Sequence, residues 1–216
     1  KAHPEHNFSS SCLRSADVIL TESLGAEETD AFPYLKAVFA PIVGRNKFAL
    51  DRLSAKGVKC FFVDGTPEIV AEHALALALA LMGKISEHDR NLKQRDNWSF
   101  CDSYWDSLLD CNVTILGTGR IGCSLVNFLR PFGCEITGYH KNLSKIPPVS
   151  YDHLTNDLRQ ALKSADVVFV TLDLNDETLN MIAEPQIELM RGKYLINVAR
   201  AAIIKEAALS DGLKDN

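Results

Sequence analysis

NVTILGTGRIGCSLV, residues 112–126, joins an apolar strand-like segment to a helix-like segment through a turn with three glycines. The turn reads GTGRIG, which is the pattern G-x-G-x-x-G. In this pattern Gly117 permits a tight turn, Gly119 lets the backbone approach a pyrophosphate, and Gly122 lets helix and strand pack closely. Backbone N–H groups and the helix dipole then face the anion. Because the motif follows a strand and opens a helix, it indicates dinucleotide binding rather than a structural glycine turn.

Strand-like and helix-like segments alternate on both sides of this motif. We expect further strands at residues 16–23, 34–41, 58–65, 135–140, 166–173 and 193–199, with helices at 49–57, 120–133, 157–165, 186–192 and 203–214. Alternation of this kind, with apolar strands, predicts parallel sheets covered by helices on both faces. The predicted fold class is α/β: a doubly wound, Rossmann-like sheet, preceded by a smaller and partial flavodoxin-like α/β domain.

The segment TPEIVAEHALALALALMGKISEHDRNLKQ, residues 66–94, is expected to begin a helix at the boundary between the two domains. Thr66 suits the N-cap, Pro67 the first helical position, and Glu68 the positive end of the helix dipole. The helix is apolar nearly all round, so we expect it to be buried on more than one side. The predicted domains are residues 1–66 and 67–216.

Composition restricts the class of protein. The chain is 46% apolar with a net charge of −5, which argues weakly against nucleic acid as a partner. No apolar run reaches the roughly 18 residues that a membrane helix needs, and the first ten residues lack the apolar core of a signal peptide. The six cysteines form no C-x-x-C pair, which favours free thiols in a cytoplasmic protein. We predict no membrane partner and no metal site.

The end of the strand at 135–140 bears on the choice of cofactor. The dinucleotide fingerprint predicts an acidic residue there, about 20 residues after the glycines, for the ribose hydroxyls. This strand instead ends at His140, followed by Lys141 and Asn142. Without the acid nothing repels a 2′-phosphate, and lysine and asparagine can donate to one. We therefore favour NADP(H) over NAD(H); alternatively, Lys141 is a solvated loop charge and the site accepts both.

A second signal lies in YLINVARAAIIKEAAL, residues 194–209. A buried strand brings Arg200 to its C-terminal end, which is the edge where ligands bind in open α/β sheets. An arginine at this edge can bind a carboxylate through two parallel hydrogen bonds. The alternative is a surface arginine that caps the strand end.

The ordered segments LGTGRIG, ADVVFVTLDLNDETLNMIA and LMRGKYLINVARAAIIKEAAL resemble signatures of the D-isomer-specific 2-hydroxyacid dehydrogenases. VGRNKFALDRLSAKGVKCFFVDGTPEIVAEHALAL resembles the substrate loop and hinge helix of that family. The resemblance covers nearly the whole chain. It implies an oxidoreductase that transfers a hydride between a nicotinamide cofactor and C2 of a small 2-keto or 2-hydroxy acid, often as a homodimer, with residues 1–66 in the substrate domain.

The resemblance also implies roles for individual residues. Arg200 matches the catalytic arginine that binds the substrate, and the backbone of Val43 and Gly44 matches the loop that holds the substrate carboxylate. Together with the glycine motif, it gives these cofactor-binding residues: Gly117, Gly119, Arg120, Ile121, Gly122, His140, Lys141, Asn142, Thr171, Leu172, Val198 and Ala199. Four residues depart from the family pattern and leave the substrate open: Asp173, Asn175, Ala201 and Lys205.

The family's catalytic histidine and glutamate follow its arginine signature, and the sequence stops at Asn216. We therefore expect part of a longer enzyme or a truncated relative, with the proton donor outside the sequence. His73 is expected to be a core residue rather than this donor. The aromatic residues Trp98, Phe100, Tyr104 and Trp105 are expected to form an arm on a partner subunit. Two other hypotheses remain: a dinucleotide-sensing, corepressor-like interaction protein, and an inactive relative.

Overall fold

The computed structural model describes residues 15–63, 65–95, 104–144 and 149–214. The chain divides into two compact units, Lys1–Gly65 and Thr66–Asn216. This division lies one residue before the boundary expected from the sequence. Cys12, Cys101, Trp98 and Phe100 fall outside the described residues.

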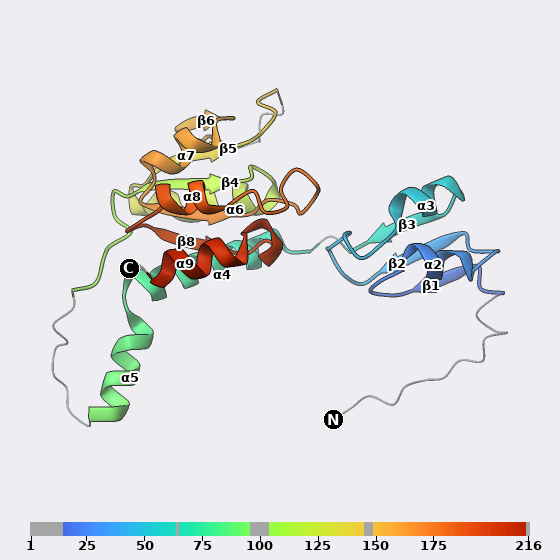
Figure 1. The fold of residues 1–216 in the computed structure, drawn as a ribbon, viewed down its shortest axis with the longest axis horizontal. Helices are drawn as coiled ribbons and strands as arrows, with labels where there is room; N and C mark the ends of the chain where they lie inside the picture. Colours follow the sequence, from blue (N-terminus) through green and yellow to red (C-terminus); the bar gives the residue numbers. More distant parts are fainter. Residues whose placement is uncertain (1–14, 64, 96–103, 145–148, 215–216) are drawn as a thin grey trace. The chain divides into compact units, whose positions relative to one another are not determined.

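The first unit is a small parallel α/β structure in which helices alternate with strands (Figure 1). Its three-stranded sheet has the order β1-β2-β3, and its elements are β1 (Val18–Leu20), α2 (Ala26–Asp30), β2 (Ala37–Ala40), α3 (Leu50–Ala55) and β3 (Lys59–Phe62). The short helix α2 was not expected. Its core consists of Leu24, Leu35, Val38, Ala40, Phe48, Leu53 and Val58.

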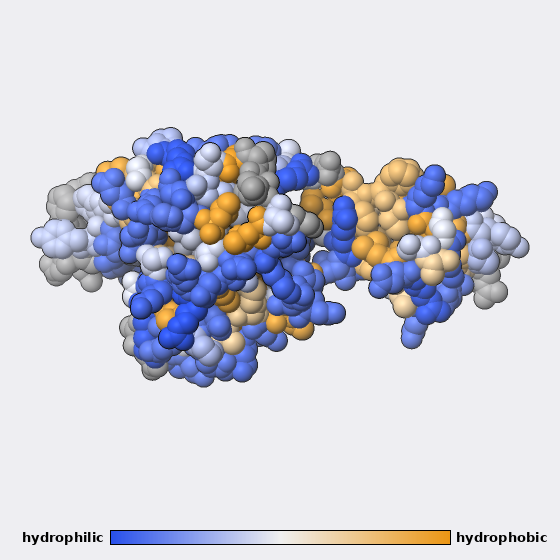
Figure 2. Space-filling model, turned by 90° about the horizontal axis from the view of Figure 1, so that it is seen from above, coloured by the Kyte–Doolittle hydropathy of each residue, from blue (hydrophilic) through white to orange (hydrophobic). Residues whose placement is uncertain are grey.

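The sheet of the first unit carries exposed apolar side chains as well as this core. Leu20 and Phe39 are cross-strand neighbours, as are Phe39 and Phe61, and all three side chains are exposed. The rings of Phe39 and Phe61 stack with their centroids 4.8 Å apart. Apolar side chains gather on part of the surface of this unit (Figure 2). Parallel sheets are normally buried on both faces, so the described residues leave part of this sheet uncovered.

The second unit contains a five-stranded parallel sheet of order β6-β5-β4-β7-β8. The strands are β4 (Asn112–Leu116), β5 (Glu135–Tyr139), β6 (His153–Thr155), β7 (Val167–Val170) and β8 (Tyr194–Asn197). The chain builds outward from β4 on one side and then returns to build on the other side. The strand order thus reverses between β4 and β7, where ligands bind in open α/β sheets. The short strand β6 was not expected.

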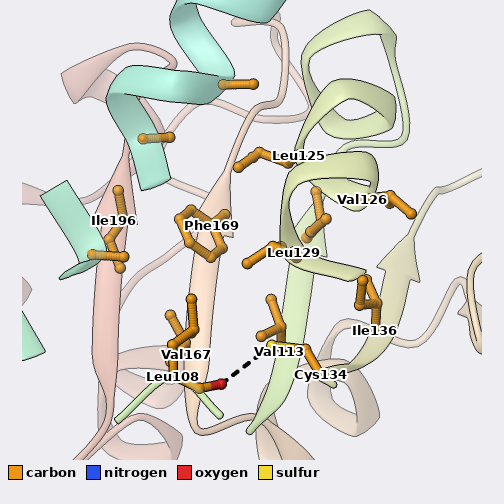
Figure 3. Close-up of a cluster of buried hydrophobic side chains, with 14 of the residues drawn as sticks. Leu108, Val113, Leu125, Val126, Leu129, Cys134, Ile136, Val167, Phe169 and Ile196 are labelled. Atoms are coloured by element: carbon orange, nitrogen blue, oxygen red, sulfur yellow. Dashed lines mark hydrogen bonds between the residues drawn. The ribbon is translucent and has the colours of Figure 1, made fainter. Parts of the chain in front are cut away.

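Helices cover both faces of this sheet. Leu125 and Leu129, from α6 (Arg120–Leu129), pack with Val113, Phe169 and the alanines of α4 (Pro67–Met82) on one face (Figure 3). The opposite face packs against α7 (Leu158–Ser164) and α8 (Glu184–Leu189), and α9 (Glu206–Lys214) lies against α8. The predicted doubly wound sheet is therefore confirmed.

The helix at the start of the second unit differs from its prediction. Thr66 is the N-cap residue, but its side chain makes no capping hydrogen bond. The helix α4 ends at Met82, and after Lys84, which has a φ of +50°, a separate helix α5 (Ile85–Arg95) begins. The expectation of burial on more than one side was wrong, because the buried positions follow one helix face: Ala71, Ala74, Ala78 and Met82. Other apolar positions of the helix, Leu77, Leu79 and Leu81, are exposed.

His73 lies on the exposed side of α4, so the expectation of a core histidine was also wrong. Within the described residues, no single helix is long and apolar enough to cross a membrane; α4 and α5 pass that test only as a pair bent by 55°.

Candidate dinucleotide site

The glycine turn after β4 folds back on itself so closely that two of its residues have no room for a side chain. Gly117 has a φ of +106°, and a Cβ there would lie 3.0 Å from the backbone of Thr171 and Leu172. A Cβ on Gly122 would lie 2.2 Å from the carbonyl oxygen of Gly117. Both positions therefore require glycine for reasons internal to the protein.

Gly119 occupies a different environment. It is the N-cap residue of α6, with an extended backbone, and among the described residues no atom outside its immediate chain neighbours lies within 4 Å of the position that a Cβ would take. Arg120, the first residue of the helix, is exposed, whereas Ile121 is half-buried. The start of α6 therefore presents bare backbone on an accessible surface. A helix N-terminus of this form attracts anions through its N–H groups and its dipole.

Neighbouring strands hold the turn in place from both sides. The N–H of Gly117 donates to the carbonyl of Tyr139 at the end of β5, over 3.1 Å. On the other side, the hydroxyl of Thr171 donates to the carbonyl of Gly117 over 2.8 Å. Thr171 thus anchors the loop, while Leu172 packs in the core on the α7–α8 face. The C-terminal ends of β4, β5 and β7 meet at the glycine turn.

Buried hydroxyls lie behind the turn. Thr118 is only 6% exposed, and its Oγ1 has no hydrogen-bond partner among the described residues. The ring of Tyr151 and the methyl of Thr118 converge on Gly138 of β5, where a Cβ would lie 2.7 Å from Tyr151 Cδ1 and 2.9 Å from Thr118 Cγ2. Burial and the neighbouring Cys123 thiol raise the pKa of Tyr151, whose hydroxyl also lacks a partner at hydrogen-bonding geometry.

Tyr151 and Gly138 were not identified from the sequence. Their signal was a glycine in the middle of a predicted strand, which marks a close approach by another group. The flanking residues fix Tyr151, because Arg130 binds both the carboxylate of Asp152, over 2.8 Å, and the carbonyl of Ser150. Burial raises the pKa of the half-buried Cys123 thiol, which favours its neutral and less nucleophilic form.

The end of β5 carries the three residues predicted to bind the adenosine ribose. The Nδ1 atom of His140 accepts the N–H of Asn142 over 2.9 Å, which puts the proton of the neutral ring on Nε2. The side-chain oxygen of Asn142 accepts the N–H of Ser144 over 3.0 Å. Lys141 is well exposed to solvent and forms an ion pair, with its Nζ 2.5 Å from Oε1 of Glu177. Sequence reasoning missed Glu177, which is distant along the chain.

The end of β8 positions Arg200. Val198 continues the pairing with β7, donating to the carbonyl of Val170 over 3.2 Å. The side chain of Asn197 then accepts the N–H of Ala199 over 3.0 Å and donates to the carbonyl of Arg200 over 3.1 Å. Arg200 is exposed, donates to the carbonyl of Ala199, and makes no ion pair with any described residue. Its guanidinium therefore retains donors for an external carboxylate.

The two residues predicted to hold the substrate carboxylate lie in the other unit. Val43 and Gly44 follow β2, and the Val43 side chain lies over Gly65, where a Cβ would be 2.5 Å from Val43 Cγ2. All the predicted cofactor residues and Arg200 belong to the second unit. Within the described residues, no group of three or more His, Cys, Asp or Glu side chains could hold a metal ion.

Comparison with known proteins accounts for this arrangement. The family model of the D-isomer specific 2-hydroxyacid dehydrogenase NAD binding domain matches residues 75–216. The chain belongs to the D-isomer specific 2-hydroxyacid dehydrogenase family. The family model describes an NAD binding domain, so the predictions of the family and of a Rossmann-like dinucleotide-binding fold are confirmed.

Individual relatives agree with the family model. The chain is 26% identical over 212 residues to a D-lactate dehydrogenase of Staphylococcus aureus (strain MRSA252), covering 94% of this chain and 63% of that protein. It is 31% identical over 194 residues to a hydroxyphenylpyruvate reductase of Plectranthus scutellarioides, covering 87% and 60%. The crystal structure of a D-lactate dehydrogenase from Aquifex aeolicus, complexed with NAD and lactic acid, matches with a TM-score of 0.86 at 26% identity, covering 97% and 64%. The chain thus spans about 63% of the length of the S. aureus relative.

The residues present fit a dinucleotide. Gly119 leaves the start of α6 bare, whereas Gly117 and Gly122 keep the turn tight. The buried and unpartnered hydroxyl of Thr118 lies within the same turn. These features belong to a loop shaped for a ligand rather than to a loop that closes a strand–helix connection.

Proposed function

We propose that the protein to which this chain belongs transfers a hydride reversibly between a nicotinamide cofactor and C2 of a small 2-keto or 2-hydroxy acid. The observation that carries this proposal is the placement of Arg200 at the C-terminal end of β8, in the same unit as the bare glycine turn. Membership of the family, whose relatives include a D-lactate dehydrogenase and a hydroxyphenylpyruvate reductase, supports it.

In the proposed reaction, the residues of the chain would bind and orient the cofactor and the substrate. The bound cofactor supplies the redox chemistry. The N–H groups at the start of α6, from Gly119 to Ile121, hold the pyrophosphate, and Thr171 keeps the loop in register. Arg200 binds and orients the substrate carboxylate through charge-assisted hydrogen bonds. The backbone of Val43 and Gly44 is proposed as the second carboxylate-binding element. We assign no described histidine as the proton donor.

We further propose NADP(H) as the favoured cofactor over NAD(H). Support comes from the end of β5, where His140, Lys141 and Asn142 stand in place of a carboxylate. Titration of both reduced cofactors by fluorescence, with a His140→Asp variant alongside, tests this preference. A lower Kd for NADH than for NADPH in the unaltered protein would contradict it.

An assay of Arg200→Ala tests the proposed reaction. With pyruvate, glyoxylate and hydroxyphenylpyruvate as substrates, we expect kcat/KM of the complete protein to fall by at least ten- to hundredfold, since a hydrogen bond to a charged group contributes about 1.5–3 kcal/mol. The Kd of the reduced cofactor should stay within about twofold. Arg191→Ala, which removes an arginine that binds Glu188 instead, is the matched control. Unchanged kcat/KM in Arg200→Ala would refute the assignment.

We also propose that the protein is a cytoplasmic homodimer that acts on a small molecule, without a nucleic-acid or membrane partner. The exposed Leu77, Leu79 and Leu81 of α4, and the exposed Tyr104 and Trp105, offer apolar surface for a second subunit. Cys60, Cys111, Cys123 and Cys134 are free thiols, which suits a reducing compartment. Light scattering of Leu77→Ser and Leu79→Ser variants tests the dimer; an unchanged mass would place its interface elsewhere.

A further inference from the structure

An ion pair joins Lys141 and Glu177, which both lie at the edge of the sheet that holds the glycine turn. Lys141 follows β5 and Glu177 follows β7, and these two strands flank β4 on opposite sides. The ion pair therefore joins loops from the two sides of β4, at the same edge of the sheet as the glycine turn. The two charged atoms lie 2.5 Å apart, and both side chains are well exposed to solvent.

Internal hydrogen bonds hold the loop that carries Glu177 in one conformation. The side-chain oxygen of Asn175 accepts the N–H of Glu177 over 2.9 Å and that of Thr178 over 3.1 Å. The hydroxyl of Thr178, a buried residue, donates to the carbonyl of Asp173 over 2.6 Å. The position of the Glu177 backbone is thus fixed by the loop itself and does not depend on the ion pair.

The charges at this edge of the sheet act on one another. Burial raises the pKa of Tyr139, and the carboxylates of Asp157 and Glu177 raise it further, while Lys141 opposes them. These groups therefore surround the strand end whose carbonyl binds Gly117. Asp157 is committed to α7, because it is the N-cap residue and accepts the N–H of Gln160. Glu177 is the acid whose carboxylate pairs with Lys141.

We propose that Glu177 is a specificity-determining residue for the cofactor, supplying from the β7 loop the carboxylate that is missing at the end of β5. This inference rests on the proposed cofactor function. A 2′-phosphate must draw Lys141 away from Glu177 and tolerate the remaining carboxylate. Ribose hydroxyls carry no charge and meet neither obstacle. Glu177 therefore restrains the preference for NADP(H) that Lys141 provides.

The test measures the Kd of NADPH and of NADH for the full chain by fluorescence titration at fixed ionic strength. Four proteins form a double-mutant cycle: the unaltered chain, Glu177→Gln, Lys141→Gln and the double variant. Glu188→Gln is the matched control, because Glu188 is a similarly exposed glutamate on α8 that pairs with Arg191. Exposed charge pairs contribute little each, so we expect Glu177→Gln to lower the Kd of NADPH by about two- to fivefold.

The Kd of NADH should change by less than about twofold in Glu177→Gln, and Lys141→Gln should reduce the gain that Glu177→Gln brings to NADPH. Glu188→Gln should leave the ratio of the two Kd values unchanged. If both cofactors bind but Glu177→Gln does not alter the ratio, or alters it no more than Glu188→Gln, the role of Glu177 is refuted while the proposed function stands. If neither cofactor binds the unaltered chain, the proposed function fails, and this inference with it.

Discussion

A single methyl group added at Gly119 should weaken cofactor binding while leaving the fold nearly intact. Gly119→Ala places a Cβ where no protein atom outside the neighbouring residues lies within 4 Å, and its φ of −75° is one that alanine adopts readily. The only internal cost is the poorer N-cap preference of alanine, about 0.5–1 kcal/mol. A pyrophosphate oxygen, however, must come within about 2.7–3.2 Å of the backbone nitrogens to accept their hydrogen bonds.

The magnitude follows from the number of bonds that the methyl group disturbs. A hydrogen bond to a charged group contributes about 1.5–3 kcal/mol, so loss of one such bond raises the Kd by roughly ten- to a hundredfold. Gly122→Ala provides a contrast, because its Cβ would lie 2.2 Å from the Gly117 carbonyl oxygen and would force the turn open. The cost of overpacking, about 1–3 kcal/mol, exceeds the gain in helix propensity, up to about 1 kcal/mol, so this variant should lose stability as well as binding.

Two measurements separate these effects. Urea unfolding gives the free energy of unfolding, and titration of NADH and NADPH fluorescence gives the Kd. Ser124→Ala, whose hydroxyl donates to the carbonyl of Arg120 within the same helix, serves as a control for a mutation in α6 away from the turn. If Gly119→Ala binds both cofactors within twofold of the unaltered chain, the start of α6 does not face the pyrophosphate.

Three further predictions concern the fold that supports the site. Burial would raise the pKa of Asp152, but the N–H of Ile136 and the guanidinium of Arg130 outweigh it, so the pKa lies below its ordinary value of 3.8. The carboxylate therefore stabilises the fold above pH 3.8, and this stabilisation is lost as the pH falls through the lowered pKa. Asp152→Asn should reduce the free energy of unfolding, measured with urea, by about 1–2 kcal/mol near pH 7 and by much less at pH 3. An equal cost at both pH values would contradict this. Phe169→Ala, in the centre of the core of Figure 3, should cost about 3–5 kcal/mol in the same measurement, and a cost below about 1 kcal/mol would mean that the cavity collapses. Lys84→Gly should raise the melting temperature by relieving the left-handed backbone between α4 and α5, worth roughly 1 kcal/mol, and a lower melting temperature would show that the lysine side chain stabilises this junction.

Apolar runs, glycines and prolines in the sequence predicted most of the strands and helices of the second unit. The strands β4, β7 and β8 are continuous apolar runs, and the glycines and the proline near Gly133 mark where elements begin and end. The strand β6 lacks such a signal, because its sequence is His-Leu-Thr and only its pairing with β5 makes it a strand. Asp152, held by Arg130 and by the N–H of Ile136, brings this segment to the edge of the sheet. That contact depends on residues about 20 positions apart, which periodicity does not detect.

The sequence of α4 also did not predict which elements pack against it. An apolar helix predicts burial, but the pattern does not state which neighbour supplies it. In the described residues the alanines of α4 pack against α6, and Leu77, Leu79 and Leu81 face outward. The same sequence would fit a helix covered by a second subunit. Periodicity thus identified the helix but not the elements that cover it, because burial depends on the neighbours of a segment as well as on its sequence.

The choice of cofactor likewise depends on a contact between distant residues that a local sequence pattern does not detect. The dinucleotide fingerprint looks for its acid at a fixed distance along the chain, and by that measure the acid is absent from this sequence. The loops that follow β5 and β7 meet at one edge of the sheet, so a carboxylate 36 residues from Lys141 lies beside it. Selectivity between ribose hydroxyls and a 2′-phosphate depends on the charges that surround the group in space. The sequence motif at the end of β5 identifies Lys141 but not Glu177, because Glu177 belongs to the loop that follows β7.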